Sequence, residues 1–147
     1  MTKAASALES AFAGDVSPRE GWDMLSESPD ALLIDVRTQP EWVFSGIPNL
    51  SKINKKTITI SWKLYPTMET NSEFTQMVQS VAPNKNTPLF FLCKTGGRST
   101  DAAIAMTQAG YPHCYNVAGG FEGDRDGEGR RGRVNGWKAA ELPWEQA

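Results

Sequence analysis

One short segment of the chain joins a continuous apolar run to a cysteine and a glycine-rich loop. Residues 88–92 end in Leu-Phe-Phe-Leu, and Cys93 follows directly. Two adjacent glycines come next, and residues 99–109 then have the composition of a helix that ends at Gly110. A strand buried on both faces, a tight loop and a helix in this order are typical of α/β domains with parallel sheets. This segment therefore constrains the fold more than any other.

The rest of the chain continues the alternation of strand-type and helix-type segments. Three further strands are predicted from apolar or alternating runs, at residues 31–36, 57–62 and 114–117. Three further helices are predicted where capping residues precede apolar residues at helical spacing, at residues 17–26, 38–45 and 72–81. The predicted fold class is therefore α/β, with a mainly parallel central sheet flanked by helices.

The size and composition of the chain predict one globular domain. Its 147 residues are 39% hydrophobic and 22% charged, which is a globular balance. The formal net charge of −2 indicates neither a nucleic-acid nor an acidic-membrane partner. We expect residues 1–16 to form an N-terminal extension and residues 17–147 to form the domain, with a loop rich in glycine and arginine at residues 124–136.

Cysteine and histidine usage predicts a reducing compartment and no metal site. The two cysteines, Cys93 and Cys114, do not resemble the dense pairs of small secreted domains, and the first residues lack the apolar core of a signal peptide. We therefore expect free thiols and a cytoplasmic location. Cys114 begins an apolar strand and is predicted to be a buried core thiol. With His113 as the only histidine, no metal or other cofactor is expected.

The loop after Cys93 has the composition of an anion-binding site. Its adjacent glycines let successive backbone N–H groups point inward, and the following helix adds its positive end. Lys94 and Arg98 add positive charge, and the planar donors of Arg98 suit an oxyanion. A cysteine thiolate is stabilised in such a setting, so Cys93 is the candidate nucleophile. The candidate substrate-binding residues are Lys94, Thr95, Gly96, Gly97, Arg98 and Ser99.

Three motifs in order resemble the signatures of the rhodanese family of sulfurtransferases in its single-domain form. They lie at residues 33–42, 93–99 and 115–121, and the resemblance extends over residues 17–143. It implies a three-layer rhodanese-like domain in which Cys93 takes a sulfane sulfur from thiosulfate or another persulfide. The sulfur then passes to a thiophilic acceptor such as cyanide, a thiol or a protein.

The resemblance also assigns a supporting role to two residues of the first motif. Asp35 and Arg37 would hold the loop after Cys93 from beneath, although an ordinary structural ion-pair network is an equally good interpretation.

Two departures from the family pattern stand out. Where the first motif usually continues with Gly-His-Ile, this chain has Ser-Gly-Ile-Pro at residues 45–48, so the usual histidine is missing. Residues 124–136 are also inserted between Gly-Gly-Phe and the following tryptophan. The four arginines of this insertion, Arg125, Arg130, Arg131 and Arg133, alternate with three acidic residues, so a solvated, self-neutralising loop is favoured over a docking surface.

Two other functions are compatible with a reactive cysteine in a positively charged loop. The loop of cysteine-dependent phosphatases and arsenate reductases has five residues between its Cys and its Arg. In this chain, four residues separate Cys93 from Arg98. The shorter loop predicts a smaller cradle, better suited to a sulfur atom than to a phosphate. A persulfide relay to one protein acceptor, or an interaction module without turnover, is the second alternative, because fold alone does not settle chemistry.

Overall fold

The computed structural model describes residues 11–146, and its centre is a five-stranded sheet with the order β1-β8-β7-β2-β4. Every neighbouring pair of strands is parallel. The strands are β1 (Gly14–Val16), β2 (Leu32–Asp35), β4 (Ile58–Thr59), β7 (Leu89–Leu92) and β8 (Cys114–Val117). The predicted α/β class with a mainly parallel sheet is confirmed.

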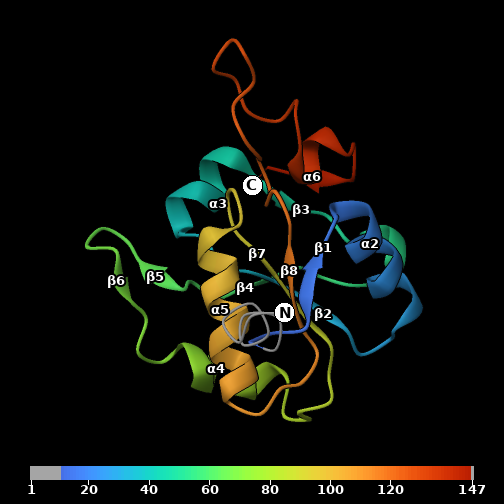
Figure 1. Ribbon diagram of the computed structural model, residues 1–147, viewed down its shortest axis with the longest axis vertical. Helices are drawn as coiled ribbons and strands as arrows, with labels where there is room; N and C mark the ends of the chain where they lie inside the picture. Colours follow the sequence, from blue (N-terminus) through green and yellow to red (C-terminus); the bar gives the residue numbers. More distant parts are fainter. Residues whose placement is uncertain (1–10, 147) are drawn as a thin grey trace, which may run out of the picture.

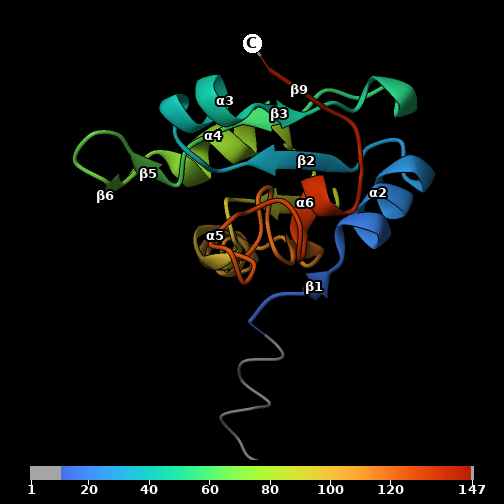
Figure 2. The same ribbon diagram turned by 90° about the horizontal axis from the view of Figure 1, so that it is seen from above.

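Helices and two small antiparallel ribbons surround this sheet. The helices are α2 (Pro18–Glu27), α3 (Gln39–Ser45), α4 (Phe74–Val81), α5 (Gly97–Gln108), α6 (Gly136–Ala139) and the 3-10 turn η1 (Ser51–Ile53). The ribbons pair β3 (Ile47–Pro48) with β9 (Trp144–Glu145) and β5 (Lys63–Leu64) with β6 (Glu69–Thr70). Figure 2 shows the β3–β9 ribbon on the side of the molecule opposite β1.

Local sequence signals account for where α2 and α3 begin, because a capping box is present at the start of each. The Ser17 hydroxyl accepts the N–H of Glu20, and the Glu20 carboxylate accepts the N–H of Ser17, so both ends of the predicted capping box are present. Pro18 occupies the first turn, where its missing N–H costs nothing. Helix α5 begins at Gly97, two residues before the predicted start.

The sheet is buried on both faces. Leu33 and Ile34 are adjacent in β2, and because successive strand residues point to opposite faces they enter different halves of the core. Helices α4 and α5 cover the face of Ile34, and α2 and α6 cover the face of Leu33 (Figure 1). This three-layer arrangement explains why the strands read as continuous apolar runs.

Two strands differ from the sequence-based expectation. Residues 14–16, expected to belong to an N-terminal extension, form the edge strand β1 and pair with β8, while residues 1–10 of that extension lie outside the described residues. The strand predicted at 57–62 is shorter as β4. Its direction continues nonetheless, because the N–H groups of Ile60 and Trp62 donate to the carbonyls of Asp35 and Val36.

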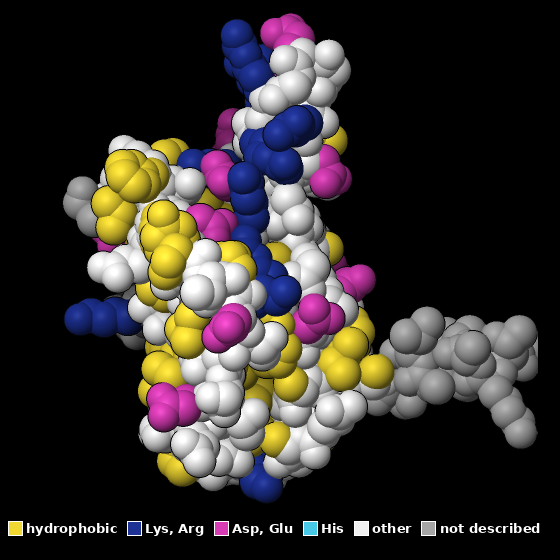
Figure 3. All heavy atoms as spheres, turned by 90° about the vertical axis from the view of Figure 1, so that its left-hand side faces the viewer, with side chains coloured by type: hydrophobic (Ala, Val, Ile, Leu, Met, Phe, Trp, Pro, Cys, Tyr) yellow, Lys and Arg dark blue, Asp and Glu magenta, His cyan; other side chains and the backbone are white. Residues whose placement is uncertain are grey.

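The predicted loop between β8 and α6 projects from the domain beyond the carboxyl ends of the strands (Figure 1). The recorded charged contacts within it centre on Asp126. Asp126 accepts the backbone N–H groups of Glu128 and Arg130 and lies 3.8 Å from Arg133. Figure 3 shows Lys and Arg side chains along this segment with Asp and Glu side chains among them. Within residues 11–146, no helix has the length and apolar content needed to cross a membrane.

Burial on both faces of β2 is testable by two substitutions. Leu33→Ala and Ile34→Ala should each lower the free energy of unfolding by about 2–5 kcal/mol, measured by urea denaturation, because each leaves a cavity in its own half of the core. Leu64→Ala, in which the native side chain is 46% exposed, is the control and should change it by less than about 0.5 kcal/mol. A negligible effect at either core position would contradict the three-layer packing.

Candidate active site

Cys93 lies directly after β7, at the carboxyl end of the central sheet. The residue is 1% exposed, and its sulfur accepts hydrogen bonds from the Gly96 N–H at 3.0 Å and the Ser99 hydroxyl at 3.1 Å. Gly96 has a φ of 122°, a conformation that favours glycine and turns its N–H back toward the sulfur. The recorded donors to Cys93 are therefore one backbone N–H and one hydroxyl, and the predicted series of inward N–H groups stays a prediction.

A polar chain continues from Ser99 to the edge of the sheet. The Ser99 Oγ lies 2.6 Å from Asn116 Oδ1, and the Asn116 side-chain amide donates to Asp15 Oδ1 at 2.9 Å. Asp15 and Asn116 sit opposite each other in the β1–β8 register. Sequence reasoning missed both residues. Asn116 falls inside the third motif, which was the only signal that could have pointed to it.

The turn after β8 forms the base of the Cys93 loop. The Phe121 N–H donates to the Cys93 carbonyl at 2.7 Å, and the N–H groups of Glu122 and Gly123 both donate to the Lys94 carbonyl at 3.1 Å. A Cβ atom on Gly120 would lie 2.5 Å from the Cys93 carbonyl oxygen. The close approach of these two segments therefore requires glycine at this position, which explains the Gly-Gly-Phe motif.

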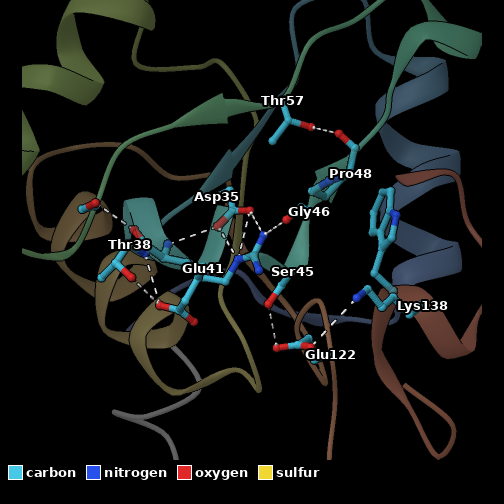
Figure 4. Close-up of polar contacts among 12 residues, drawn as sticks. Asp35, Thr38, Glu41, Ser45, Gly46, Pro48, Thr57, Glu122 and Lys138 are labelled. Carbon is cyan, nitrogen blue, oxygen red and sulfur yellow. Dashed lines mark hydrogen bonds and ion pairs between the residues drawn. The ribbon is translucent and has the colours of Figure 1, made fainter. Parts of the chain in front are cut away.

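Asp35 and Arg37 form a fully buried ion pair beside this base. Both side chains are 0% exposed, with Arg37 Nη2 2.7 Å from Asp35 Oδ2 and Nε 2.9 Å from Oδ1. Arg37 Nη2 also donates to the Gly46 carbonyl at 2.7 Å, a contact visible in Figure 4, and the guanidinium lies 4.4 Å from the centre of the Phe121 ring. The pair therefore contacts Phe121, whose N–H binds the Cys93 carbonyl, and the predicted supporting role would act through this residue.

Arg98 has a partner that the sequence did not reveal. Its two terminal nitrogens donate to the Glu41 carboxylate at 2.7 and 2.9 Å, and both side chains are about 20% exposed. Glu41 also accepts from the N–H and hydroxyl of Thr38 at the start of α3 (Figure 4). The expectation that Arg98 binds substrate stays a prediction, because these two donors already serve Glu41.

The Arg98–Glu41 pair shifts the pKa of both members. Partial burial disfavours the charged form of Glu41, but the hydrogen bonds and charge of Arg98, helped by Thr38, outweigh it and lower the pKa of Glu41. The hydrogen bond to Glu41 raises the pKa of Arg98 against the effect of burial, and negative charge on Cys93 adds to the rise. Arg98 is thus electrostatically coupled to the cysteine.

The predicted loop residues, apart from the buried Ser99, are more exposed than Cys93, whereas the second cysteine lies in the core. Lys94 is partly buried, while Thr95 and Gly97 are exposed at the mouth of the loop. Cys114 is fully buried, and desolvation raises the pKa of its thiol to about 11, so it stays protonated at neutral pH. The prediction that Cys114 is a core thiol is confirmed.

The segment that replaces the family's Gly-His-Ile packs closely against β9. A Cβ atom on Gly46 would lie 2.6 Å from the Glu145 carbonyl oxygen of β9, and Gly46 has a φ of 92°. Ser45 lies 3.5 Å from Glu122, which in turn lies 3.9 Å from Lys138 (Figure 4). The backbone here approaches β9 too closely for a side chain at Gly46.

Comparisons with known proteins identify the family. A family model described as the STR4 middle domain matches residues 13–147. The chain is 38% identical over 132 residues to RC0915, an uncharacterized protein of Rickettsia conorii, covering 89% of this chain and 96% of that protein. The crystal structure of Rv0390 from M. tuberculosis has a TM-score of 0.84 at 41% identity, covering 92% of this chain and 99% of that one.

Two further relatives carry descriptive names. The chain is 30% identical over 131 residues to the chloroplastic protein THYLAKOID RHODANESE-LIKE of Oryza sativa subsp. indica, covering 89% of this chain and 25% of that protein. It is 33% identical over 86 residues to thiosulfate sulfurtransferase GlpE of Tolumonas auensis, covering 58% of this chain and 74% of that protein. The chain belongs to the rhodanese family.

The Arg98–Glu41 pair should make the free energy of unfolding depend on pH. Because folding lowers the pKa of Glu41, its contribution to stability is complete above the ordinary value of 4.5 and is lost as the pH falls through the lower folded value. Glu41→Gln should therefore lower the free energy of unfolding by about 1–3 kcal/mol at pH 7, and by progressively less in acid.

Glu20→Gln provides the matched control for this comparison. Glu20 has the same place in the capping box of α2, but the recorded hydrogen bonds to its carboxylate come from Ser17 and not from an arginine. Urea denaturation of both variants between pH 3 and pH 7 separates the capping contact from the ion pair. Equal losses in the two variants would show that Arg98 adds nothing to stability.

Proposed function

We propose that the protein is a sulfurtransferase that carries a sulfane sulfur as a persulfide on Cys93. The observation that carries the proposal is the setting of the sulfur, which accepts the Gly96 N–H and the Ser99 hydroxyl at the mouth of a loop closed by Arg98. Donors aimed at one sulfur atom stabilise negative charge there. They suit a Cys93 thiolate, whose charge lies on that atom.

In the first half-reaction, the Cys93 thiolate attacks the outer sulfur of thiosulfate. A bond forms between that sulfur and Cys93 Sγ, and the bond between the two sulfurs of thiosulfate breaks. Sulfite leaves with the electron pair, so the three negative charges of the reactants become one on the persulfide and two on sulfite. Lys94 and Arg98 supply positive charge near the place where the sulfonate group enters.

In the second half-reaction, a thiophilic acceptor attacks the outer sulfur of the persulfide. Cyanide, a small thiol or a protein thiolate takes this sulfur, and the Cys93 thiolate departs with the electron pair of the broken bond. The enzyme returns to its starting state without net oxidation. Covalent catalysis of this kind divides the transfer into two displacement steps at a single sulfur.

Two observations favour sulfur over phosphate as the transferred group. Four residues separate Cys93 from Arg98, and the carboxylate of Glu41 engages two donors of that arginine. A phosphate would need those donors for its own oxygens, whereas a terminal sulfur needs fewer. The name of the thiosulfate sulfurtransferase from Tolumonas auensis supports the same choice.

The proposal also includes a class of sulfur acceptor and a type of cellular compartment. The proposed acceptor is a small thiol or a protein thiol. The proposed compartment is reducing and of the cytoplasmic type, consistent with two unpaired cysteines in the structure. A dedicated relay to one protein would use the same persulfide, so it differs from the proposal only in its acceptor.

Intact-mass spectrometry after thiosulfate treatment tests the proposal. The protein should gain one sulfur, about 32 Da, that a reductant removes. Cys93→Ser should gain none because it lacks the nucleophile. Cys114→Ala is the matched control and should gain sulfur as the unaltered protein does, since Cys114 is buried and protonated.

The same samples decide between the alternatives. Turnover with thiosulfate and cyanide supports the enzyme, whereas loading without turnover, relieved only by a protein thiol, supports a relay. Hydrolysis of an aryl phosphate by a protein that gains no sulfur would replace the proposal with a phosphatase.

A further inference from the structure

The Ser99 hydroxyl has one hydrogen and two acceptors within reach. Cys93 Sγ lies 3.1 Å from its oxygen and Asn116 Oδ1 lies 2.6 Å from it. A hydroxyl donates one hydrogen bond, so at any moment the hydrogen points either to the sulfur or to the amide oxygen. Ser99 and Asn116 are both buried, so the two acceptors compete for this hydrogen.

Asp15 fixes which end of the Asn116 amide faces Ser99. The Asn116 nitrogen donates to the Asp15 carboxylate at 2.9 Å, and an ionised carboxylate only accepts. The amide oxygen must therefore point the other way, toward Ser99. Asn116 is 5% exposed, and Ser99 is the donor recorded for its oxygen within the described residues.

The charge on the sulfur decides which acceptor receives the hydrogen. A thiolate is a strong acceptor and draws the hydroxyl from Asn116, leaving a buried amide oxygen unpaired, which is costly. In a thiol the S–H can donate to Ser99, whose hydroxyl then donates to Asn116. In a persulfide the charge resides on the outer sulfur, so the inner sulfur is a weak acceptor and the hydroxyl returns to Asn116.

We infer that Asn116, held by Asp15, is a positioning residue that competes with Cys93 for the Ser99 hydroxyl, destabilises the resting thiolate and so favours the persulfide. The inference extends the proposed sulfur transfer and rests on it for its consequence in turnover. Competition from Asn116 makes the hydrogen bond to the thiolate less favourable, and a less stabilised thiolate is more basic and therefore a stronger nucleophile. Asn116 thereby promotes both attack on the donor and retention of the sulfur.

Titration of the Cys93 thiolate, followed by its absorbance near 240 nm, measures the effect in the resting protein. Asn116→Leu keeps the size of the side chain and removes the oxygen, so Ser99 donates to sulfur alone. The pH at which half of Cys93 is ionised should fall by about 0.5–1 unit. Ser99→Ala removes the donor, and the same midpoint should rise by about 1 unit.

The opposite signs separate positioning from a merely structural role. Any substitution that only loosened the loop would remove donors from the sulfur, and both variants would then raise the midpoint. Asn116→Leu in the Ser99→Ala background should have no effect, because Asn116 acts through that hydroxyl. The charged groups around the site are retained in every variant; they are Asp15 of β1, Asp35 of β2, Arg37 after β2, Glu41 of α3, Lys94 of the loop and Arg98 of α5.

Persulfide loading gives a second readout. The loaded fraction of Cys93, measured by intact mass at fixed ratios of thiosulfate to sulfite, should require about three- to tenfold more thiosulfate in Asn116→Leu. Far-UV circular dichroism checks the fold, and Asn116→Ala replaces the Leu variant in both measurements if the latter does not fold.

A midpoint that rises or does not move in the Asn116 variants overturns the inference, as does an equal shift in the Ser99→Ala background. The titration needs no sulfur donor, so it is independent of the proposed function. Failure to load any sulfur would remove the proposed function while leaving the titration result intact.

Discussion

The buried ion pair of Asp35 and Arg37 is the constraint on which the carboxyl-end edge of the sheet depends. Neither side chain contacts solvent, so each charge must be satisfied inside the protein. Arg37 binds Asp35 through Nε and Nη2, donates from Nη2 to the Gly46 carbonyl after α3 and lies on the face of the Phe121 ring. Its Nη1 is buried without a recorded hydrogen-bond partner among the described residues. One guanidinium therefore joins β2, the end of α3 and the turn after β8. Because the Phe121 N–H donates to the Cys93 carbonyl, that turn is also the base of the reactive loop.

A second, more exposed ion pair closes the loop from the other side. Glu41 belongs to α3, which begins just after β2, and it binds Arg98 at the start of α5. The loop that carries Cys93 thus contacts one ion pair through the turn after β8 and the other through Arg98. Arg37 and Arg98 are each engaged by a carboxylate, and the hydrogen bonds recorded to the sulfur come from one backbone N–H and one hydroxyl. A site built in this way stabilises a single charged atom better than a tetrahedral oxyanion such as phosphate.

The local parts of this structure were predictable because their signals are local. Four apolar residues in β7 are buried on both faces, and the glycines that follow permit the tight connection to α5. Capping pairs such as Ser17 with Glu20 lie three residues apart, so the start of a helix can be read directly. The short strand β1 could not be predicted from its local sequence. Its three residues have no clear period, and they are held by pairing with β8, about a hundred positions later in the chain.

The sequence by itself determined the class of fold, the position of Cys93 and the donors in its own loop. The tertiary structure decided what surrounds that loop: Glu41 is 57 positions from Arg98, and Asp15 is 101 positions from Asn116. These pairs depend on the strand order, which places β8 between β1 and β7, and no local pattern encodes that order. Short-range signals specify which backbone conformation a segment adopts, whereas the partners of a buried polar group depend on how the segments pack.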